Sequence, residues 1–255
     1  MSKVALRKEG HVAIISVERP EALNSLNREI VDDIGLLIEE VKQDADIYCL
    51  IFHSEKNFAA GADIKAMAVC NEEEAKAFCF SPIFDKIAKM PIPTIAAIEG
   101  YALGGGMELA LCADMRIAGE SAKIGFPEVT LGIFPGGGGT IRVPKLIGPA
   151  LAMELIFTGD RIDAERALRI GLVNRVVADD QVLAEAKSLA ERIAKRGPVA
   201  VRMAKDVILR GLEEPDVDKG TEMEAVQWAK VFNTYDQKEG MTAFMEKRKP
   251  VFENR

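Results

Sequence analysis

The chain has 255 residues, of which 48% are hydrophobic and 29% are charged. These proportions are typical of globular proteins and exclude disordered, collagen-like and low-complexity chains. Acidic residues outnumber basic ones by 40 to 33, and the net charge of −7 argues against a nucleic-acid binder, since such proteins usually carry a basic excess or a basic stripe.

The N-terminal residues 1–4 show neither an apolar leader nor an Arg- and Ser-rich transit segment, which predicts a cytoplasmic protein. The longest stretch without Asp, Glu, Lys, Arg or His covers only residues 129–141. A bilayer span needs roughly 20 apolar residues, so no membrane span is predicted. The cysteines form no CxxC pair and no zinc-ligand spacing, a pattern typical of free thiols in a reducing compartment: Cys49, Cys70, Cys79 and Cys112.

The first half of the chain alternates strand and helix patterns. Residues 12–17 form an apolar run that predicts a strand. Over residues 30–41 apolar side chains recur at the spacing of one helical face, and Asn27 precedes them as a suitable N-cap. Three further strands are predicted at residues 47–52, 94–98 and 115–118. This alternation indicates a layered α/β core.

From about residue 148 the pattern becomes mainly helical, with one short strand predicted at residues 173–177. Helices are predicted at residues 151–157, 164–170, 180–195 and 199–210. Near the C-terminus, Asp236 followed by Glu239 resembles the capping box of a last helix.

A domain boundary is expected at Gly197-Pro198, which breaks the helical pattern and is followed by nothing strand-like. Residues 1–196 then form a core that holds the active site. Residues 197–255 form a C-terminal helical subdomain.

Glycine is concentrated in two places, residues 100–106 and residues 136–139. Glycine allows a backbone to approach a ligand closely, and a glycine-rich turn before a helix directs N–H groups at one point. Neither run fits the GxGxxG or GxxxxGK[ST] spacing, and the chain contains no GxSxG, so nucleotide binding and a serine nucleophile are disfavoured. An oxyanion-binding turn and simple tight packing remain as the two interpretations.

Acid–base chemistry is expected from carboxylates, because the chain has only two histidines, His11 and His53. Glu108 follows the glycine turn in the first turn of a predicted helix, and Glu128 lies between apolar residues. Apolar surroundings raise the pKa of a carboxyl group toward values useful for proton transfer, and two such groups can divide acid and base roles. Taken singly, a glutamate in a first helical turn is more often a dipole or capping residue.

A third segment, residues 56–65, is a turn of small residues flanked by lysines. Small residues here indicate a backbone that approaches something closely. The alternative is an ordinary loop with a helix cap at Asp63.

Together these segments resemble the enoyl-CoA hydratase/isomerase (crotonase) family. The matching stretches cover nearly the whole chain in order: RPEALNSL at 19–26, FAAGADI at 58–64, GYALGGGMELA at 100–110, PEVTLGIFPG at 127–136, and the tail at 236–249. The resemblance implies an α/β fold, a spiral of repeated ββα units with a C-terminal helical trimerisation region.

The resemblance also implies the roles of five residues. Two backbone N–H groups, of Ala62 and Gly105, would stabilise the enolate of an acyl-CoA thioester. Glu108 would activate the water that attacks the β-carbon, and Glu128 would deliver a proton to the α-carbon. The N–H of Gly136 would help to hold that water. Contacts to coenzyme A are implied for Lys56, Ala60, Asp63, Ile64, Lys65 and, from a neighbouring subunit, Lys247.

The activity implied is that of a lyase of fatty-acid β-oxidation, an enoyl-CoA hydratase that adds water reversibly and syn to a trans-2-enoyl-CoA and gives a 3-hydroxyacyl-CoA. It implies no metal, no redox cofactor, no nucleic acid and no membrane, and a homo-oligomer that is a trimer or a dimer of trimers. The alternatives are an enoyl-CoA isomerase, a hydratase of cyclic dienoyl-CoA, and a non-catalytic RNA-binding relative, which the acidic balance disfavours.

Three positions depart from the commonest hydratase pattern. Phe126 replaces a usual Gln, Glu99 replaces a frequent Asn, and Ile141 stands where Gln often follows the Gly-Gly-Thr turn. Phe126 adds apolar bulk beside Glu128 and is expected to reshape the acyl pocket. These changes put the substrate, rather than the type of reaction, in question.

Overall fold

The computed structural model describes residues 3–255, so residues 1 and 2 of the N-terminal segment discussed above lie outside the described part. Its centre is a six-stranded sheet in the order β1-β2-β3-β4-β6-β9, in which β1 is antiparallel to β2 and all other neighbours are parallel. The strands are β1 (Val4–Glu9), β2 (Val12–Val17), β3 (Cys49–His53), β4 (Thr94–Ile98), β6 (Met115–Gly119) and β9 (Arg175–Val177).

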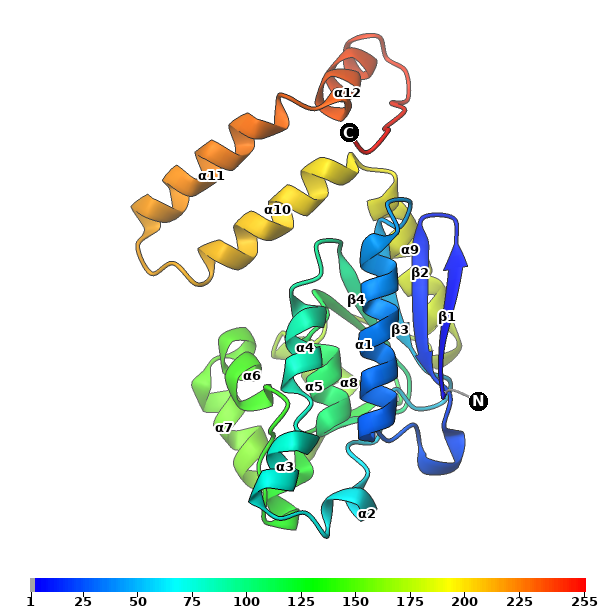
Figure 1. Ribbon diagram of the computed structural model, residues 1–255, viewed down its shortest axis with the longest axis vertical. Helices are drawn as coiled ribbons and strands as arrows, with labels where there is room; N and C mark the ends of the chain where they lie inside the picture. The colour runs from blue at the N-terminus through cyan, green and yellow to red at the C-terminus, as the bar shows by residue number, and fades with distance from the viewer. Residues whose placement is uncertain (1–2) are drawn as a thin grey trace.

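Strands β2, β3 and β4 are buried at every position, as expected of strands that are covered on both faces of the sheet. One face packs against α1 (Arg28–Gln43) and the other against α9 (Val182–Ala194), so successive residues of each strand enter different cores. Figure 1 shows α1 and α9 on either side of the sheet. All five strand predictions are confirmed within two residues of each boundary.

The helix predictions are confirmed as well. α1 begins after Asn27, whose side chain accepts a hydrogen bond from the Ile30 N–H at 2.9 Å. The four later segments correspond to α7 (Pro149–Thr158), α8 (Ala164–Arg169), α9, and α10 (Pro198–Gly211). Among residues 3–255, none of the helices is both long enough and apolar enough to cross a membrane.

A second, three-stranded sheet was not predicted. It consists of β5 (Tyr101–Leu103), β7 (Lys123–Gly125) and β8 (Arg161–Asp163). Strands of three residues are too short to show an alternating pattern. β5 leads directly into α5 (Gly105–Leu111), so this small sheet fixes the glycine turn between them. The remaining short elements are α2 (Ile64–Met67), α3 (Glu72–Phe78), α4 (Ser81–Ala88), α6 (Gly139–Ile147) and the 3-10 helices at Pro20–Ala22, Pro127–Leu131 and Asp179–Gln181.

The C-terminal helices α10, α11 (Val217–Val231) and α12 (Tyr235–Met245) extend away from the sheet (Figure 1). α10 is fastened to the core by Lys205, a buried lysine on this helix. Its ammonium donates to the Ile92 carbonyl at 2.9 Å and to the Asp114 carboxylate at 2.7 Å. No strand follows Gly197 among the described residues.

The predicted capping box at the last helix is wrong. α12 is capped by Thr234, whose hydroxyl accepts from the Gln237 N–H at 3.1 Å. Asp236 is buried inside the first turn, and its carboxylate accepts from the backbone N–H groups of residues 253 and 254. Glu239 pairs with Arg248 at 2.6 Å instead. The returning C-terminal segment supplies partners that a local pattern does not reveal.

Candidate active site

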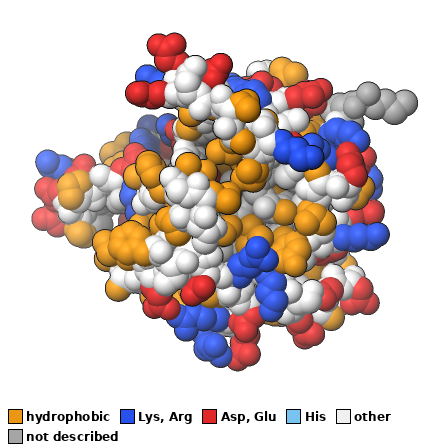
Figure 2. All heavy atoms as spheres, turned by 90° about the horizontal axis from the view of Figure 1, so that it is seen from below, with side chains coloured by type: hydrophobic (Ala, Val, Ile, Leu, Met, Phe, Trp, Pro, Cys, Tyr) orange, Lys and Arg blue, Asp and Glu red, His pale blue; other side chains and the backbone are white. Residues whose placement is uncertain are grey.

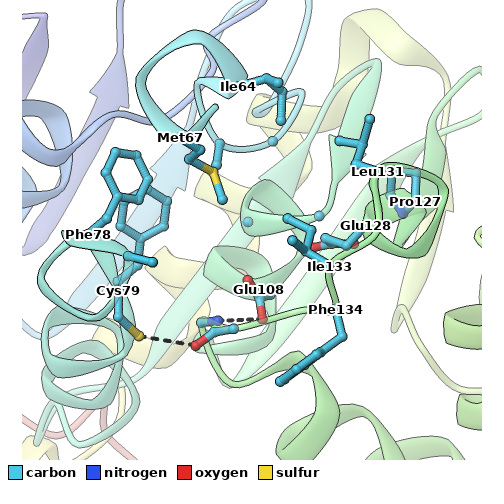
Figure 3. Close-up of a pocket in the computed structure, with 18 of the residues that line it drawn as sticks. Ile64, Met67, Phe78, Cys79, Glu108, Pro127, Glu128, Leu131, Ile133 and Phe134 are labelled. Carbon is cyan, nitrogen blue, oxygen red and sulfur yellow. Dashed lines mark hydrogen bonds between the residues drawn. The ribbon is translucent and has the colours of Figure 1, made fainter. Parts of the chain in front are cut away.

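A cavity of about 340 Å³ lies where the glycine turn before α5 meets the loop that precedes α2 (Figure 3). Seven of the predicted site residues line it: Ala60, Ala62, Ile64, Gly105, Glu108, Glu128 and Gly136. The walls between these groups are mainly apolar and come from Met67, Phe78, Phe80, Leu131, Ile133 and Phe134. On the face of the molecule seen from below, hydrophobic side chains gather near the centre with charged side chains around them (Figure 2).

Two backbone turns face each other across one part of this cavity. The Leu26 N–H donates to the Gly61 carbonyl, and the Leu26 carbonyl accepts from the Asp63 N–H. Both chain neighbours of Ala62 are therefore hydrogen-bonded to Leu26. Because successive N–H groups of an extended segment point to opposite sides, the Ala62 N–H points away from Leu26.

Gly105 supplies the opposing backbone. It is the first residue of α5, and a Cβ placed on it would lie 3.6 Å from the nitrogen of Ala62. The first N–H groups of a helix have no partner inside the helix. Gly104, with φ of +49°, makes the turn that a residue with a side chain rarely adopts. The Ala62 and Gly105 backbones are therefore close enough to present donors to one bound oxygen atom.

Glu108 points from the first turn of α5 into the cavity and is only 3% exposed. One carboxylate oxygen accepts two backbone hydrogen bonds, from Gly137 at 2.8 Å and from Gly139 at 2.7 Å. Burial raises the pKa of Glu108, although these two N–H groups and the charge of Arg142 act in the opposite direction. The Glu108 carboxyl group is thus fixed through one oxygen, and its second oxygen accepts no hydrogen bond from residues 3–255.

Glycine is required at positions 137 and 139 because the Glu108 carboxyl group lies so close to their backbone that a side chain would not fit. A Cβ on Gly137 would lie 2.7 Å from one Glu108 oxygen, and a Cβ on Gly139 would lie 3.0 Å from the other. The sequence predicted the glycine run and a water contact for the Gly136 N–H, but it did not predict the hydrogen bonds from Gly137 and Gly139 to Glu108. Gly136 lines the cavity, and its expected contact with a water molecule stays a prediction. The run of four glycines at residues 136–139 was the feature of the sequence that pointed to Gly137 and Gly139. Which glycine contacts Glu108 depends on the direction of the Glu108 side chain, which the sequence does not show.

Glu128 enters the cavity from the 3-10 helix Pro127–Leu131. One of its carboxyl oxygens is buried without a hydrogen-bond partner in the described part of the chain. Burial raises the pKa of Glu128 to about 7, and the nearby charge of Glu108 adds to this effect. At neutral pH this group therefore exists in both protonated and ionised forms, as suits a proton donor.

Four predicted contact residues lie outside the cavity lining: Lys56, Asp63, Lys65 and Lys247. Asp63 caps α2 and pairs with Arg19 at 2.9 Å, and this arginine lowers the pKa of Asp63. The cap proposed as the alternative for this residue is thus confirmed. Lys247 follows α12, at the opposite end of the molecule from the cavity (Figure 1), so within one chain it does not reach the site.

The three departures from the hydratase pattern also lie outside the cavity lining. Phe126 is fully buried behind the glycine run, where its ring would lie 3.1 Å from a Cβ on Gly139. Phe126 therefore does not line the cavity itself, and its effect on the acyl pocket stays a prediction. Glu99 accepts hydrogen bonds from His53 at 2.8 Å and from the Lys56 N–H at 3.2 Å, and Ile141 is exposed.

Comparison with known proteins agrees with this architecture. Residues 7–255 match the family model described as Enoyl-CoA hydratase/isomerase. The chain is 43% identical to the short-chain-enoyl-CoA hydratase of Clostridium acetobutylicum, over 100% of this chain and 99% of the relative, and 45% identical to the crotonyl-CoA hydratase of Syntrophomonas wolfei, over 98% and 97%. The crystal structure of an enoyl-CoA hydratase from Bacillus anthracis superposes with a TM-score of 0.96 at 40% identity, covering 99% of this chain and 100% of that one.

Proposed function

The chain belongs to the enoyl-CoA hydratase/isomerase family, and on this premise we propose that it adds water reversibly and syn to a short-chain trans-2-enoyl-CoA, which makes it a lyase that forms 3-hydroxyacyl-CoA. One observation carries the proposal. A buried carboxyl group, Glu108, and a half-buried one, Glu128, share one mainly apolar cavity with the backbone segments of Ala62 and Gly105.

The N–H groups of Ala62 and Gly105 would hold the thioester oxygen. When water adds to the β-carbon, electron density moves to this oxygen and an enolate forms. Donors that are already in place at the position of developing charge lower the barrier, because nothing has to reorganise during the reaction. The dipole of α5 adds to this effect at Gly105.

The two glutamates would divide the proton transfers. Glu108, whose carboxyl group is fixed in place by two N–H groups, takes a proton from water in its ionised form while the water oxygen bonds to the β-carbon. Glu128, whose pKa near 7 keeps part of it protonated, gives its proton to the α-carbon. The reverse reaction uses the same groups with the roles exchanged.

The proposal needs no metal or redox group. Hydration changes no oxidation level overall, and the acid, the base and the oxyanion donors all come from the chain itself. Coenzyme A belongs to the substrate. Its phosphates are proposed to bind Lys56 and Lys65, the two lysines that flank the small-residue loop.

Two observations support a short acyl group: the size of the cavity and the substrates in the names of the relatives. The cavity measures about 340 Å³, and Phe78 and Phe80 form part of its wall. The relatives with 43% and 45% identity are named for short-chain and crotonyl substrates. Such a reaction is a step of fatty-acid β-oxidation, and the four free thiols are compatible with the reducing cytoplasm.

We also propose a homo-oligomer, a trimer or a dimer of trimers. Large apolar side chains are exposed on the C-terminal helices, including Trp228 on α11 and Phe244 on α12. Burying such side chains against a second copy is favourable. Lys247 would then approach the site of a neighbouring subunit.

The proposed function is tested with crotonyl-CoA by following the loss of its enone-thioester absorbance. Glu108→Gln and Glu128→Gln should each lower kcat by roughly 10²–10⁴, the usual contribution of a positioned acid or base. Unchanged turnover in both variants would refute the assigned roles. Product analysis with a 3-enoyl-CoA distinguishes the isomerase alternative, which would give a 2-enoyl-CoA without adding water.

A further inference from the structure

Successive peptide groups of the glycine loop, residues 136–139, are held from their carbonyl side. The carbonyl of Gly136 accepts a hydrogen bond from the Cys79 thiol at 3.2 Å. The same peptide unit carries the Gly137 N–H that donates to Glu108. Because a peptide unit is rigid and its C=O and N–H point in opposite directions, the thiol fixes the direction of this donor. Figure 3 shows the two hydrogen bonds on either side of the loop.

Arg142 holds the next two peptide groups. Its guanidinium donates to the Gly137 carbonyl at 3.1 Å, and its own backbone N–H donates to the Gly138 carbonyl at 2.9 Å. The Gly138 carbonyl shares a peptide unit with the Gly139 N–H, the second donor to Glu108. This bond comes from the backbone of Arg142 and not from its side chain. The guanidinium itself holds the Gly137–Gly138 peptide unit, which lies between the two donor peptide units. The guanidinium is itself held by an ion pair with Asp85 of α4.

We propose that Arg142 and Cys79 are positioning residues for Glu108, which orient the peptide groups of the glycine loop so that two N–H groups converge on one carboxylate oxygen. Neither side chain bonds to Glu108 itself; both act through the loop. The inference rests on the proposed role of Glu108 as the base in hydration.

Arg142 has a second effect, through its charge. The ionisable groups that face Glu108 are Glu128 across the cavity, Arg142 on α6 with Asp85 behind it, and Cys112, whose thiol donates to the Glu108 carbonyl at 3.1 Å. Among these, Arg142 is the group that lowers the pKa of Glu108, whereas burial raises it. Removing the guanidinium should therefore raise this pKa and move the acidic limb of the kcat profile to higher pH.

The kinetic test compares paired variants. Arg142→Gln and Cys79→Ala should each lower kcat roughly tenfold while KM stays within about twofold, since misplaced catalytic groups affect the reaction more than binding. Arg142→Lys should keep the acidic limb near that of the wild type, and Cys79→Ser should recover most of kcat. Arg166→Gln and Cys70→Ala are matched controls, because these residues pair with Glu154 and with the Ala66 carbonyl, away from the loop.

A spectroscopic readout separates this inference from the proposed function. Infrared pH-difference spectra follow the Glu108 carboxyl directly, with Glu108→Gln to assign its band. A higher titration midpoint in Arg142→Gln supports the inference even where the wild type fails to hydrate crotonyl-CoA, an outcome that would overturn the proposed function alone. An unchanged midpoint together with wild-type kcat in both variants would overturn the inference. Asp85→Asn is a smaller change that removes the ion pair of the Arg142 guanidinium, and it should also lower kcat. This variant keeps the test decisive if Arg142→Gln does not fold.

Discussion

At the residue scale, the site depends on how closely a backbone approaches Glu108. Gly137 and Gly139 do not have positive φ values, so their conformation is open to alanine. What excludes a side chain is the carboxylate, 2.7 Å and 3.0 Å from the positions of the added Cβ atoms. The requirement for glycine at these positions is therefore steric and reports directly on the contact with Glu108.

Gly137→Ala is expected to lower kcat by roughly 10² by displacing Glu108 from its two donors, in line with the effect of a misplacement of about 1 Å. Initial rates with crotonyl-CoA measure this loss. Gly220→Ala on α11 is the control, because a Cβ there meets nothing within 4 Å; it should leave kcat unchanged. Wild-type activity in Gly137→Ala would contradict the prediction.

The raised pKa of Glu128 also predicts a pH-dependent stability. Its folded-state pKa of about 7 lies above the ordinary 4.5, so the folded state binds the proton more tightly than the unfolded state does. The stability that this proton contributes is complete below pH 4.5 and is lost as the pH rises through 7. Relative to wild type, Glu128→Gln should therefore gain about 2 kcal/mol of unfolding free energy between pH 5 and pH 8.

Urea unfolding at both pH values, at one fixed protomer concentration, measures this difference. Glu120→Gln serves as a control, since Glu120 is an exposed glutamate on the surface. An equal free-energy difference between Glu128→Gln and wild type at pH 5 and pH 8 would contradict the assigned burial of Glu128.

At the element scale, a few specific contacts fix the positions of individual strands and helices. The small sheet β5-β7-β8 fixes the strand that enters the glycine turn, and the Asn27 cap fixes the start of α1. α10 depends on Lys205, which is 8% exposed and joins the helix to the carbonyl of Ile92 and the carboxylate of Asp114. A buried ammonium with both partners in place is costly to remove, because its partners are then left without it.

Lys205→Met should lower the unfolding free energy by about 3 kcal/mol, since the Asp114 carboxylate loses its buried cation. The matched control is Lys86→Met, because Lys86 forms an exposed pair with Glu39 at 3.3 Å; its loss should cost less than about 1 kcal/mol. Urea unfolding curves give both values. Equal costs for the two variants would show that Lys205 does not anchor α10.

At the scale of the whole molecule, the C-terminal helices extend from the core and carry exposed apolar side chains. α11 has no buried residue, and Trp228 on this helix packs against Phe232, the residue that follows the helix, with ring centroids 4.6 Å apart. A helix with this exposure in a single chain is expected to be covered by another copy.

Trp228→Glu combined with Phe244→Glu should therefore convert the proposed trimer or hexamer into smaller species, because charges would enter an apolar interface. Light scattering after size-exclusion chromatography gives the mass. Leu36→Glu, an exposed leucine on α1, should leave the assembly intact. A wild-type protein of 27.8 kDa in solution would refute the proposal.

The sequence by itself determined the features that depend on neighbouring residues. The apolar runs predicted the central strands, the spacing of residues 30–41 predicted α1 together with its cap at Asn27, and the glycine turn before Glu108 marked the site. These features form through local hydrogen bonds and through the burial of one face, both of which leave a periodic pattern in the chain.

Only the tertiary structure decided which groups meet across long separations. Glu108 finds its donors 29 and 31 residues away, Cys79 reaches Gly136 across 57 residues, and Asp236 is held by the returning C-terminus rather than capping a helix. Phe126 likewise turned out to lie behind the loop instead of in the cavity. Such contacts depend on how distant segments pack, and no short-range pattern records that packing.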